Sequence, residues 1–148
     1  MVPLNGRPIV EYQVRWMQSQ GVTDVVFLTG YLGEKVEEHF GDGSALGIRA
    51  HYSKEESPLG RGGAIRRGMA MLPREERTVL VTNGDNVTDL DLNHLKDRHK
   101  TTGALASLML TRYPSQFGVV EVGEGDLIED FVEKGMLPIW INAGVYLF

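Results

Sequence analysis

Short apolar runs alternate with amphipathic stretches through the first two thirds of the chain, and this order limits the possible folds more than any other feature. The runs DVVFLTG and TVLVT are apolar at most positions and rich in β-branched residues, as in strands buried on both faces. The stretch that begins at Pro8 places Val10, Val14 and Met17 at helical spacing. Alternation of strands and helices favours a parallel sheet with right-handed crossovers, so we expect an α/β fold.

The same patterns predict the individual elements. Helices are expected over residues 8–20, 33–40, 64–72 and 91–100. Strands are expected over residues 24–30, 48–53, 78–82, 104–111, 118–122, 127–133 and 143–148. The last third is strand-rich, which predicts added hairpins. No repeat or break in composition indicates a second domain, so residues 1–148 are expected to form one domain.

Composition excludes several classes of function. Lys and Arg total 15 against 20 Asp and Glu, and the net charge of -5 provides no basic field for nucleic acid. No apolar run approaches the roughly 20 residues that span a bilayer, and no basic and apolar leader opens the chain, so we expect no membrane association and a cytoplasmic protein. There is no cysteine, and the four histidines share no spacing. Solvated surface or core positions are expected for His39, His51, His94, His99, Arg66, Arg67, Glu75 and Glu76.

Ligands of open α/β sheets bind beyond the carboxyl ends of the strands, so residues that follow apolar runs are the candidates. Asp85 follows TVLVT directly, in a turn that Asn83 and Gly84 allow to be sharp. A carboxylate placed there can hold Mg²⁺ against substrate phosphates, because Mg²⁺ takes one or two protein carboxylates together with phosphate oxygens. Asn-Gly-Asp is also an ordinary turn sequence, and that interpretation stays open.

A glycine-rich segment, PLGRGG, precedes the helix expected from Ala64. Its glycines, Gly60, Gly62 and Gly63, lie within four residues, which favours close approach of a ligand to the backbone. First-turn amides and the positive end of the helix dipole suit an anion or the polar edge of a base. The segment matches neither G-x-G-x-x-G nor the P-loop, and a purely structural cap remains the alternative.

The C-terminal third contains three further candidate stretches, FGVVE, EKG and WINAG. Glu133 can accept hydrogen bonds from sugar hydroxyls, Lys134 can neutralise a phosphate, and Asn142 offers a donor and an acceptor. Together these residue types indicate a sugar phosphate site, whereas taken singly each is also typical of a solvated surface.

In chain order these stretches resemble the sugar-1-phosphate nucleotidylyltransferase family, and within it the mannose- and heptose-1-phosphate guanylyltransferases most. The motifs that carry the resemblance are MVPLNGRPIVEY, GVTDVVFLTGYLGEKVEEHFGDGS, PLGRGGAI, VTNGDNVTDLDL, FGVVEV, EKG and INAGVYLF. The resemblance implies a Rossmann-like three-layer sandwich with a mostly parallel sheet, here incomplete. It also implies Mg²⁺-dependent condensation of a nucleoside triphosphate, GTP above others, with a sugar-1-phosphate to give a nucleotide sugar and pyrophosphate.

The resemblance also implies roles for single residues. Leu59, Gly60, Gly62 and Gly63 would contact the nucleotide together with Asn83 and Gly84. Asp85 would ligate Mg²⁺ and, with Lys134, would be catalytic. The sugar phosphate would be bound by Gly118, Glu133, Lys134, Asn142 and Gly144.

The sequence departs from the family pattern in ways that affect the expected activity. The family's first strand and its G-G-x-G-T-R-L loop do not precede Met1, and a second metal-binding Asp would lie beyond Phe148. Arg61 stands where Thr or Ser is usual, and Gly135 where Pro is usual. Because the missing loop normally holds the triphosphate, these 148 residues alone are expected to be a partial domain with little transfer activity.

Two alternatives stay open beside the enzyme. One is a non-catalytic relative that binds a sugar phosphate or nucleotide and serves as a regulatory or assembly subunit. The other is a structural fragment that needs a further chain. The family's first strand normally lies centrally in the sheet, so its absence predicts unpaired strand edges or exposed apolar strand surface, which would favour a homo-oligomer.

Overall fold

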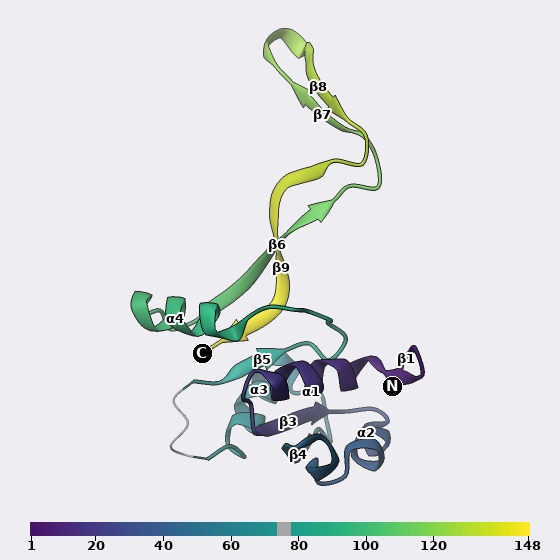
Figure 1. Cartoon of the computed structure of the whole chain (residues 1–148), viewed down its shortest axis with the longest axis vertical. Helices are drawn as coiled ribbons and strands as arrows, with labels where there is room; N and C mark the ends of the chain where they lie inside the picture. Colours follow the sequence, from purple (N-terminus) through teal and green to yellow (C-terminus); the bar gives the residue numbers. More distant parts are fainter. Residues whose placement is uncertain (74–77) are drawn as a thin grey trace.

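The computed structural model describes residues 1–73 and 78–148, so Glu75 and Glu76 lie outside the described residues. Figure 1 shows an α/β body, built mainly from the first two thirds of the chain, and a long β arm that extends away from it. The longest helices in the described ranges, α1 and α4, have 11 residues each and cannot cross a membrane.

The body contains four helices of at least eight residues among the described residues. Its elements are β1 (Pro3–Leu4), β2 (Arg7–Pro8), α1 (Ile9–Ser19), β3 (Asp24–Thr29), α2 (Gly33–Phe40), the 3-10 turn η1 (Ser44–Leu46), β4 (Arg49–Lys54), α3 (Gly60–Met69), β5 (Leu80–Thr82) and α4 (Leu92–Thr102). The predicted helices and strands of this region are confirmed with shifted ends. The largest shift is in α3, which begins at Gly60 and so includes the segment predicted as a loop.

Helix α3 packs closely on β3 near its C-terminal end. Gly68 is buried, and a Cβ added to it would lie 2.3 Å from Leu28 Cδ2, so α3 approaches the strand closely. Glycine disfavours helices in isolation, yet tertiary contacts override such propensities. The three glycines occupy the first turn of this helix.

The remaining strands build the arm. They are β6 (Ser107–Pro114), β7 (Val119–Val122), β8 (Ile128–Val132) and β9 (Met136–Leu147), with the 3-10 turn η2 (Glu124–Asp126) between β7 and β8. Both β5 and β6 pair antiparallel with β9, and β7 pairs antiparallel with β8. Many apolar side chains of the β7–β8 hairpin are exposed, including Phe131 at 61%. The expected hairpins of the last third are confirmed.

Parallel pairing is found, among the described strands, between β3 and β4, in register from Asp24 with Arg49 to Thr29 with Lys54. The core lies over this pair and contains Val14, Met17, Val25, Phe27, Phe40 and Ile48. Phe27 stacks between Phe40 and Tyr52, with ring centroids 4.7 and 5.4 Å away. The α/β class is thus built around a parallel pair, while β5 belongs to a separate antiparallel sheet.

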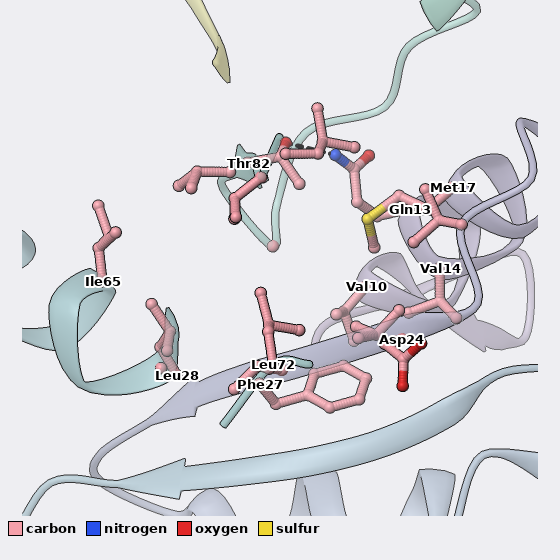
Figure 2. Close-up of a pocket in the computed structure, with 18 of the residues that line it drawn as sticks. Val10, Gln13, Val14, Met17, Asp24, Phe27, Leu28, Ile65, Leu72 and Thr82 are labelled. Atoms are coloured by element: carbon pink, nitrogen blue, oxygen red, sulfur yellow. Dashed lines mark hydrogen bonds between the residues drawn. The ribbon is translucent and has the colours of Figure 1, made fainter. Parts of the chain in front are cut away.

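A cavity of about 720 Å³ separates β3 from β5. Every residue of both strands lines it, together with residues of α1, α3 and α4. Figure 2 shows part of this lining, with Gln13 and Thr82 on one side and Phe27 and Leu28 on the other. Because side chains alternate between the faces of a strand, a cavity that touches every residue must run along the strand edges. The incomplete sheet expected from the sequence is therefore confirmed as a gap between two strand edges.

Hydrogen bonds identify which backbone groups face this cavity. The carbonyls of Thr23 and Thr29 accept from Arg49 and Glu55 of the β4 side, at 2.7 and 2.8 Å. Successive residues of a strand direct their backbone polar groups to opposite edges. The odd-numbered residues of β3 therefore face β4, and the N–H groups of Val26 and Leu28 face the cavity.

A half-buried carboxylate, Asp24, fixes the start of β3. Arg49 Nε donates to Asp24 Oδ1 at 2.7 Å, Arg49 Nη2 donates to Asp24 Oδ2, and His51 Nε2 lies 3.3 Å from Oδ1. The hydrogen bond from Arg49 is the main cause that lowers the pKa of Asp24 to about 2, against the opposing effect of burial. Asp24 is thus a structural ion-pair partner of β4.

Hydrogen exchange tests the free edge of β3. We expect the amides of Val26 and Leu28 to exchange at least about tenfold faster than those of Val25 and Phe27, which bond to β4. Residue-resolved exchange by NMR measures this directly. Equal protection of all four amides would mean that another segment pairs with the edge.

The ion pair predicts a pH dependence of stability. A depressed pKa contributes stability above the unfolded value of 3.8, and this contribution is lost as the pH falls to about 2. Asp24→Asn should therefore be less stable at neutral pH and should lose less stability than the parent between pH 4 and pH 2. Asp97→Asn, at an exposed position of α4, is the control. Urea unfolding at each pH gives the comparison, and identical slopes for the Asp24 variant and the parent would contradict the account.

Candidate functional site

The loop after β5 carries the predicted metal carboxylate. Asn83, Gly84 and Asp85 follow β5 directly and are exposed. Gly84 and Asp85 also line the end of the cavity between β3 and β5. Asp85 makes no side-chain hydrogen bond or ion pair with the residues that the structure describes. Its carboxylate oxygens are therefore available to a ligand.

Helix α1 and Gln20, the residue that follows it, hold the loop and its two ends through three side chains. Gln13 Nε2 donates to Thr82 Oγ1 at 2.5 Å, and Trp16 Nε1 donates to the Leu90 carbonyl at 2.9 Å. Gln20 Oε1 accepts from the Leu92 N–H at 3.0 Å. These contacts span the loop from the end of β5 to the start of α4. The loop that carries the predicted site is therefore attached to a helix of the core.

The structure brings the INAG stretch of β9 against the loop. The Asn83 N–H donates to the Gly144 carbonyl at 3.2 Å, and Asn86 Nδ2 donates to the Ala143 carbonyl at 2.7 Å. A Cβ on Gly144 would lie 2.4 Å from Asn86 Nδ2 and 2.5 Å from Asn83 Nδ2. Gly144 also has a φ of 74°, in the left-handed region that favours glycine. A glycine is thus required here by both space and conformation.

Asn142 uses its side chain within β9 itself. Its Oδ1 accepts from the Gly144 N–H at 2.9 Å, and its Nδ2 donates to Tyr146 Oη at 2.5 Å. The side chain is exposed, next to the junction of β9 with the loop. These two bonds use one donor hydrogen and one acceptor lone pair of the amide, so Asn142 keeps one further donor and one acceptor position for a ligand.

The glycines of α3 are placed at its first turn. Gly60 has a φ of 69°, and a Cβ on Gly60 or Gly62 would meet no atom within 4 Å. A Cβ on Gly63 would lie 2.9 Å from Leu59 Cβ, so close packing against Leu59 explains the glycine at this position. Packing does not explain Gly62, which leaves open space along the helix start.

The FGVVE and EKG stretches of the third predicted group belong to the β7–β8 hairpin and the turn after it, which extend away from β5 (Figure 1). Glu133 and Lys134 form the exposed turn between β8 and β9, and Lys134 has a left-handed φ of 52°. Ten positions separate Lys134 from Gly144, as much as about 33 Å of extended chain at about 3.3 Å per residue. Gly118 packs under Phe131, whose Cζ would lie 2.6 Å from an added Cβ. In this conformation the arm residues do not meet the loop.

The donor set suits a cation that shares its ligands with a substrate. Among the described residues, no three His, Cys, Asp or Glu side chains gather in a way that could hold a metal ion. Asp85 stands alone with the amide of Asn83 nearby, and a single carboxylate completed by phosphate and water oxygens is what Mg²⁺ accepts. The residues present therefore fit a magnesium ion that a nucleotide brings with it.

Glu11 and Asp24, two carboxylates with a lowered pKa, are structural. Asp24 begins β3, at the end opposite to the carboxyl edge where ligands bind in such sheets. Glu11 is buried on α1, where Arg15 Nε donates to it at 2.8 Å and His39 Nε2 lies 3.0 Å away. The hydrogen bond from Arg15 is the main cause that lowers the pKa of Glu11. Both groups join helices and strands of the core.

Sequence reasoning missed Asn86 and the anchoring residues of α1. Asn86 directly follows the Asn-Gly-Asp turn, and this adjacency was its one local signal. Its partner is 57 positions away in the chain, so no local pattern indicates the contact.

Comparison with known proteins identifies the relatives of this chain. The nucleotidyl transferase family model matches residues 1–148. A mannose-1-phosphate guanylyltransferase of Mycobacterium tuberculosis is 38% identical over 152 aligned residues, which cover 100% of this chain and 42% of that protein. A D-glycero-α-D-manno-heptose 1-phosphate guanylyltransferase of Campylobacter jejuni is 35% identical over 148 residues, covering 99% and 64%. The chain thus spans 42% to 64% of the length of these two relatives.

Solved structures agree on the fold. HddC from Yersinia pseudotuberculosis, complexed with GMP-PN, superposes with a TM-score of 0.76 at 21% identity, covering 100% of this chain and 65% of that one. A putative glucose-1-phosphate thymidylyltransferase from Bacillus anthracis gives a TM-score of 0.72 at 21% identity, covering 99% and 61%. These neighbours confirm the Rossmann-like fold class. Since the family model matches the whole sequence, the chain belongs to the nucleotidyl transferase family.

Proposed function

We propose that this chain is a partial domain of an enzyme that joins a nucleoside triphosphate, GTP in the first place, to a sugar-1-phosphate. The observation that carries the proposal is the junction between residues 83–86 and 142–144, which fastens the loop of Asp85 to the INAG stretch, while the Asp85 carboxylate has no partner among the described residues. Both guanylyltransferase relatives named above act on sugar 1-phosphates. The products would be a GDP-sugar and pyrophosphate.

Asp85 would hold Mg²⁺ in this site. The ion would neutralise phosphate charge and draw the nucleotide and sugar phosphates together. Asp85 lies in a loop that α1 and β9 fix, so the carboxylate is held in place before substrate arrives. Such positioning is the main contribution a protein makes to transfer between phosphates.

The first turn of α3 would take the nucleotide. The backbone of Leu59, Gly60, Gly62 and Gly63 is exposed or half-buried, and open space lies beside Gly60 and Gly62. Backbone N–H groups at a helix start, with the positive end of its dipole, favour an anionic or polar edge of a ligand. Asn83 and Gly84 would approach the same ligand from the loop.

The sugar phosphate would be bound by Asn142 and Gly144 on β9 and by Gly118, Glu133 and Lys134 on the arm. The reaction is in-line attack of the sugar phosphate oxygen on the α-phosphorus, with pyrophosphate as the leaving group. Because the arm residues lie away from Asp85, the arm would have to bend over the loop to complete the site. The left-handed backbone of Lys134 is a local strain of the kind found at functional turns.

The same separation supports a second candidate, a relative that binds nucleotide or sugar phosphate without catalysing transfer. Release of pyrophosphate from GTP and mannose-1-phosphate separates the two. Sustained release supports the enzyme, whereas saturable binding of either substrate without release supports the binding protein.

Asp85 provides the central test of the proposed site. Asp85→Ala should abolish Mg²⁺-dependent GTP binding and leave the melting temperature nearly unchanged, because the side chain is exposed and has no described partner. Calorimetric titration with and without Mg²⁺ measures this. Asp89→Ala, an exposed carboxylate of the same loop, is the matched control and should bind as the parent does. Unchanged Mg²⁺-dependent affinity in the Asp85 variant would remove Asp85 from the metal site.

Lys134 tests the contribution of the arm. Lys134→Ala should weaken sugar-1-phosphate binding by about tenfold or more, since a charge-assisted hydrogen bond to the phosphate is lost. Lys35→Ala, on the exposed face of α2, should have no effect. If titration gives the same affinity for both variants, Lys134 is an ordinary surface residue and the arm is not part of the site.

A further inference from the structure

We propose that Asn86 is a positioning residue, which fastens the loop that carries Asp85 to the INAG stretch of β9. This inference rests on the proposed function, in which Asp85 holds the metal. Asn86 is not itself placed against substrate. It acts through the backbone that presents Asp85.

Two hydrogen bonds attach the loop to β9, one on each side of Asp85. On one side the Asn83 N–H donates to the Gly144 carbonyl at 3.2 Å, and on the other Asn86 Nδ2 donates to the Ala143 carbonyl at 2.7 Å. The accepting carbonyls belong to consecutive residues of β9. Gly84 and Asp85 lie between the two bonded residues, so this segment of the loop is attached to β9 at both of its ends.

The Ala143 carbonyl is available to Asn86 because the ladder of β9 with β6 is irregular there. Leu110 pairs with Asn142 and Leu108 pairs with Tyr146, with a register shift between them. The left-handed Gly144 lies inside this irregular segment. Bulges leave backbone groups without ladder partners, and a buried carbonyl needs a substitute donor. The amide of Asn86, which is half-buried, is that donor for Ala143.

Space around Gly144 makes the fastening specific. The amide nitrogens of Asn83 and Asn86 both lie where a Cβ of residue 144 would be, at 2.5 and 2.4 Å. The two amides therefore pack directly over a glycine, and they fix the distance between the loop and the strand. Since Asn142 lies two residues before Gly144, the loop and this proposed sugar phosphate contact keep a constant separation.

Loss of Asn86 should free one end of the Asp85 segment. In Asn86→Ala the Ala143 carbonyl loses its donor, and the backbone of Asp85 becomes mobile. The hydrogen bond from the Asn83 N–H to the Gly144 carbonyl remains. We expect the Mg²⁺-dependent part of GTP affinity to fall about tenfold, because a mobile carboxylate must be ordered on binding. GTP affinity measured in EDTA should not change, since the first turn of α3 is untouched.

The experiment compares Asn86→Ala with Asn93→Ala and Asn86→Gln. Asn93 is an exposed asparagine of α4 and is the control for the change of residue type. Asn86→Gln keeps a side-chain donor and should recover part of the Mg²⁺-dependent affinity. Calorimetry with GTP, with and without Mg²⁺, gives the affinities, and thermal melting reports stability. Equal loss of the Mg²⁺-dependent and Mg²⁺-independent affinities, without recovery in Asn86→Gln, would mean a merely structural role and overturn the proposal.

A second measurement decides the matter independently of nucleotide binding. NMR relaxation should show the Asp85 amide ordered in the parent and flexible in Asn86→Ala, with Asn93→Ala like the parent. An unchanged order parameter at Asp85 would overturn the proposal. If the parent binds no GTP in a Mg²⁺-dependent manner, the proposed function fails, and the relaxation result still shows whether Asn86 fastens the loop.

Discussion

Pairing of β5 with the last residues of β9 is the interaction on which the candidate site depends. Val79 exchanges both backbone hydrogen bonds with Phe148, at 3.0 and 3.1 Å, and the pairing continues to Asn83 and Gly144. It brings together two segments about 60 positions apart in the sequence. Without it, the loop of Asp85 and the INAG stretch would have no common support. The anchoring of the same loop by α1 then attaches this pair to the body of the molecule.

The free edges of β3 and β5 show what this arrangement leaves unsatisfied. Backbone groups of Val26 and Leu28 face a cavity of about 720 Å³ that both strands line along their length. Helix α1 closes it on one side and α3 on another, so the surroundings are those of an inner strand of an α/β sheet. The chain spans 42% to 64% of the two sequence relatives compared with it.

Local patterns predicted the body well and the connections poorly. Hydrophobic periodicity and the residues at the ends of the segments predicted the bounds of α1, β3 and α2 to within one or two residues, because each of these elements buries one face or runs through the core. The predicted start of α3 at Ala64 was wrong by four residues, because the low helix propensity of glycine favoured a loop over residues 60–63, where the helix already begins. The strand predicted over 143–148 is the end of β9, which begins at Met136. Pro138 lies where β9 pairs with β6 but not with β5, and such an edge tolerates a proline inside a strand. The bond from Asn86 to Ala143 depends on register between distant strands, which no local signal specifies.

The central claim is that one metal–nucleotide complex contacts the loop and β9 together, and paramagnetic broadening tests it most directly. Mn²⁺ replaces Mg²⁺ in a complex with GTP, and amide signals near the ion broaden in NMR spectra of the whole chain. We expect the amides of residues 83–86 and 142–144 to broaden together, Mn²⁺ without GTP to give a weaker effect, and Asp85→Ala to remove both. Broadening confined to another carboxylate, such as Glu11 on α1 or Asp24 on β3, would contradict it.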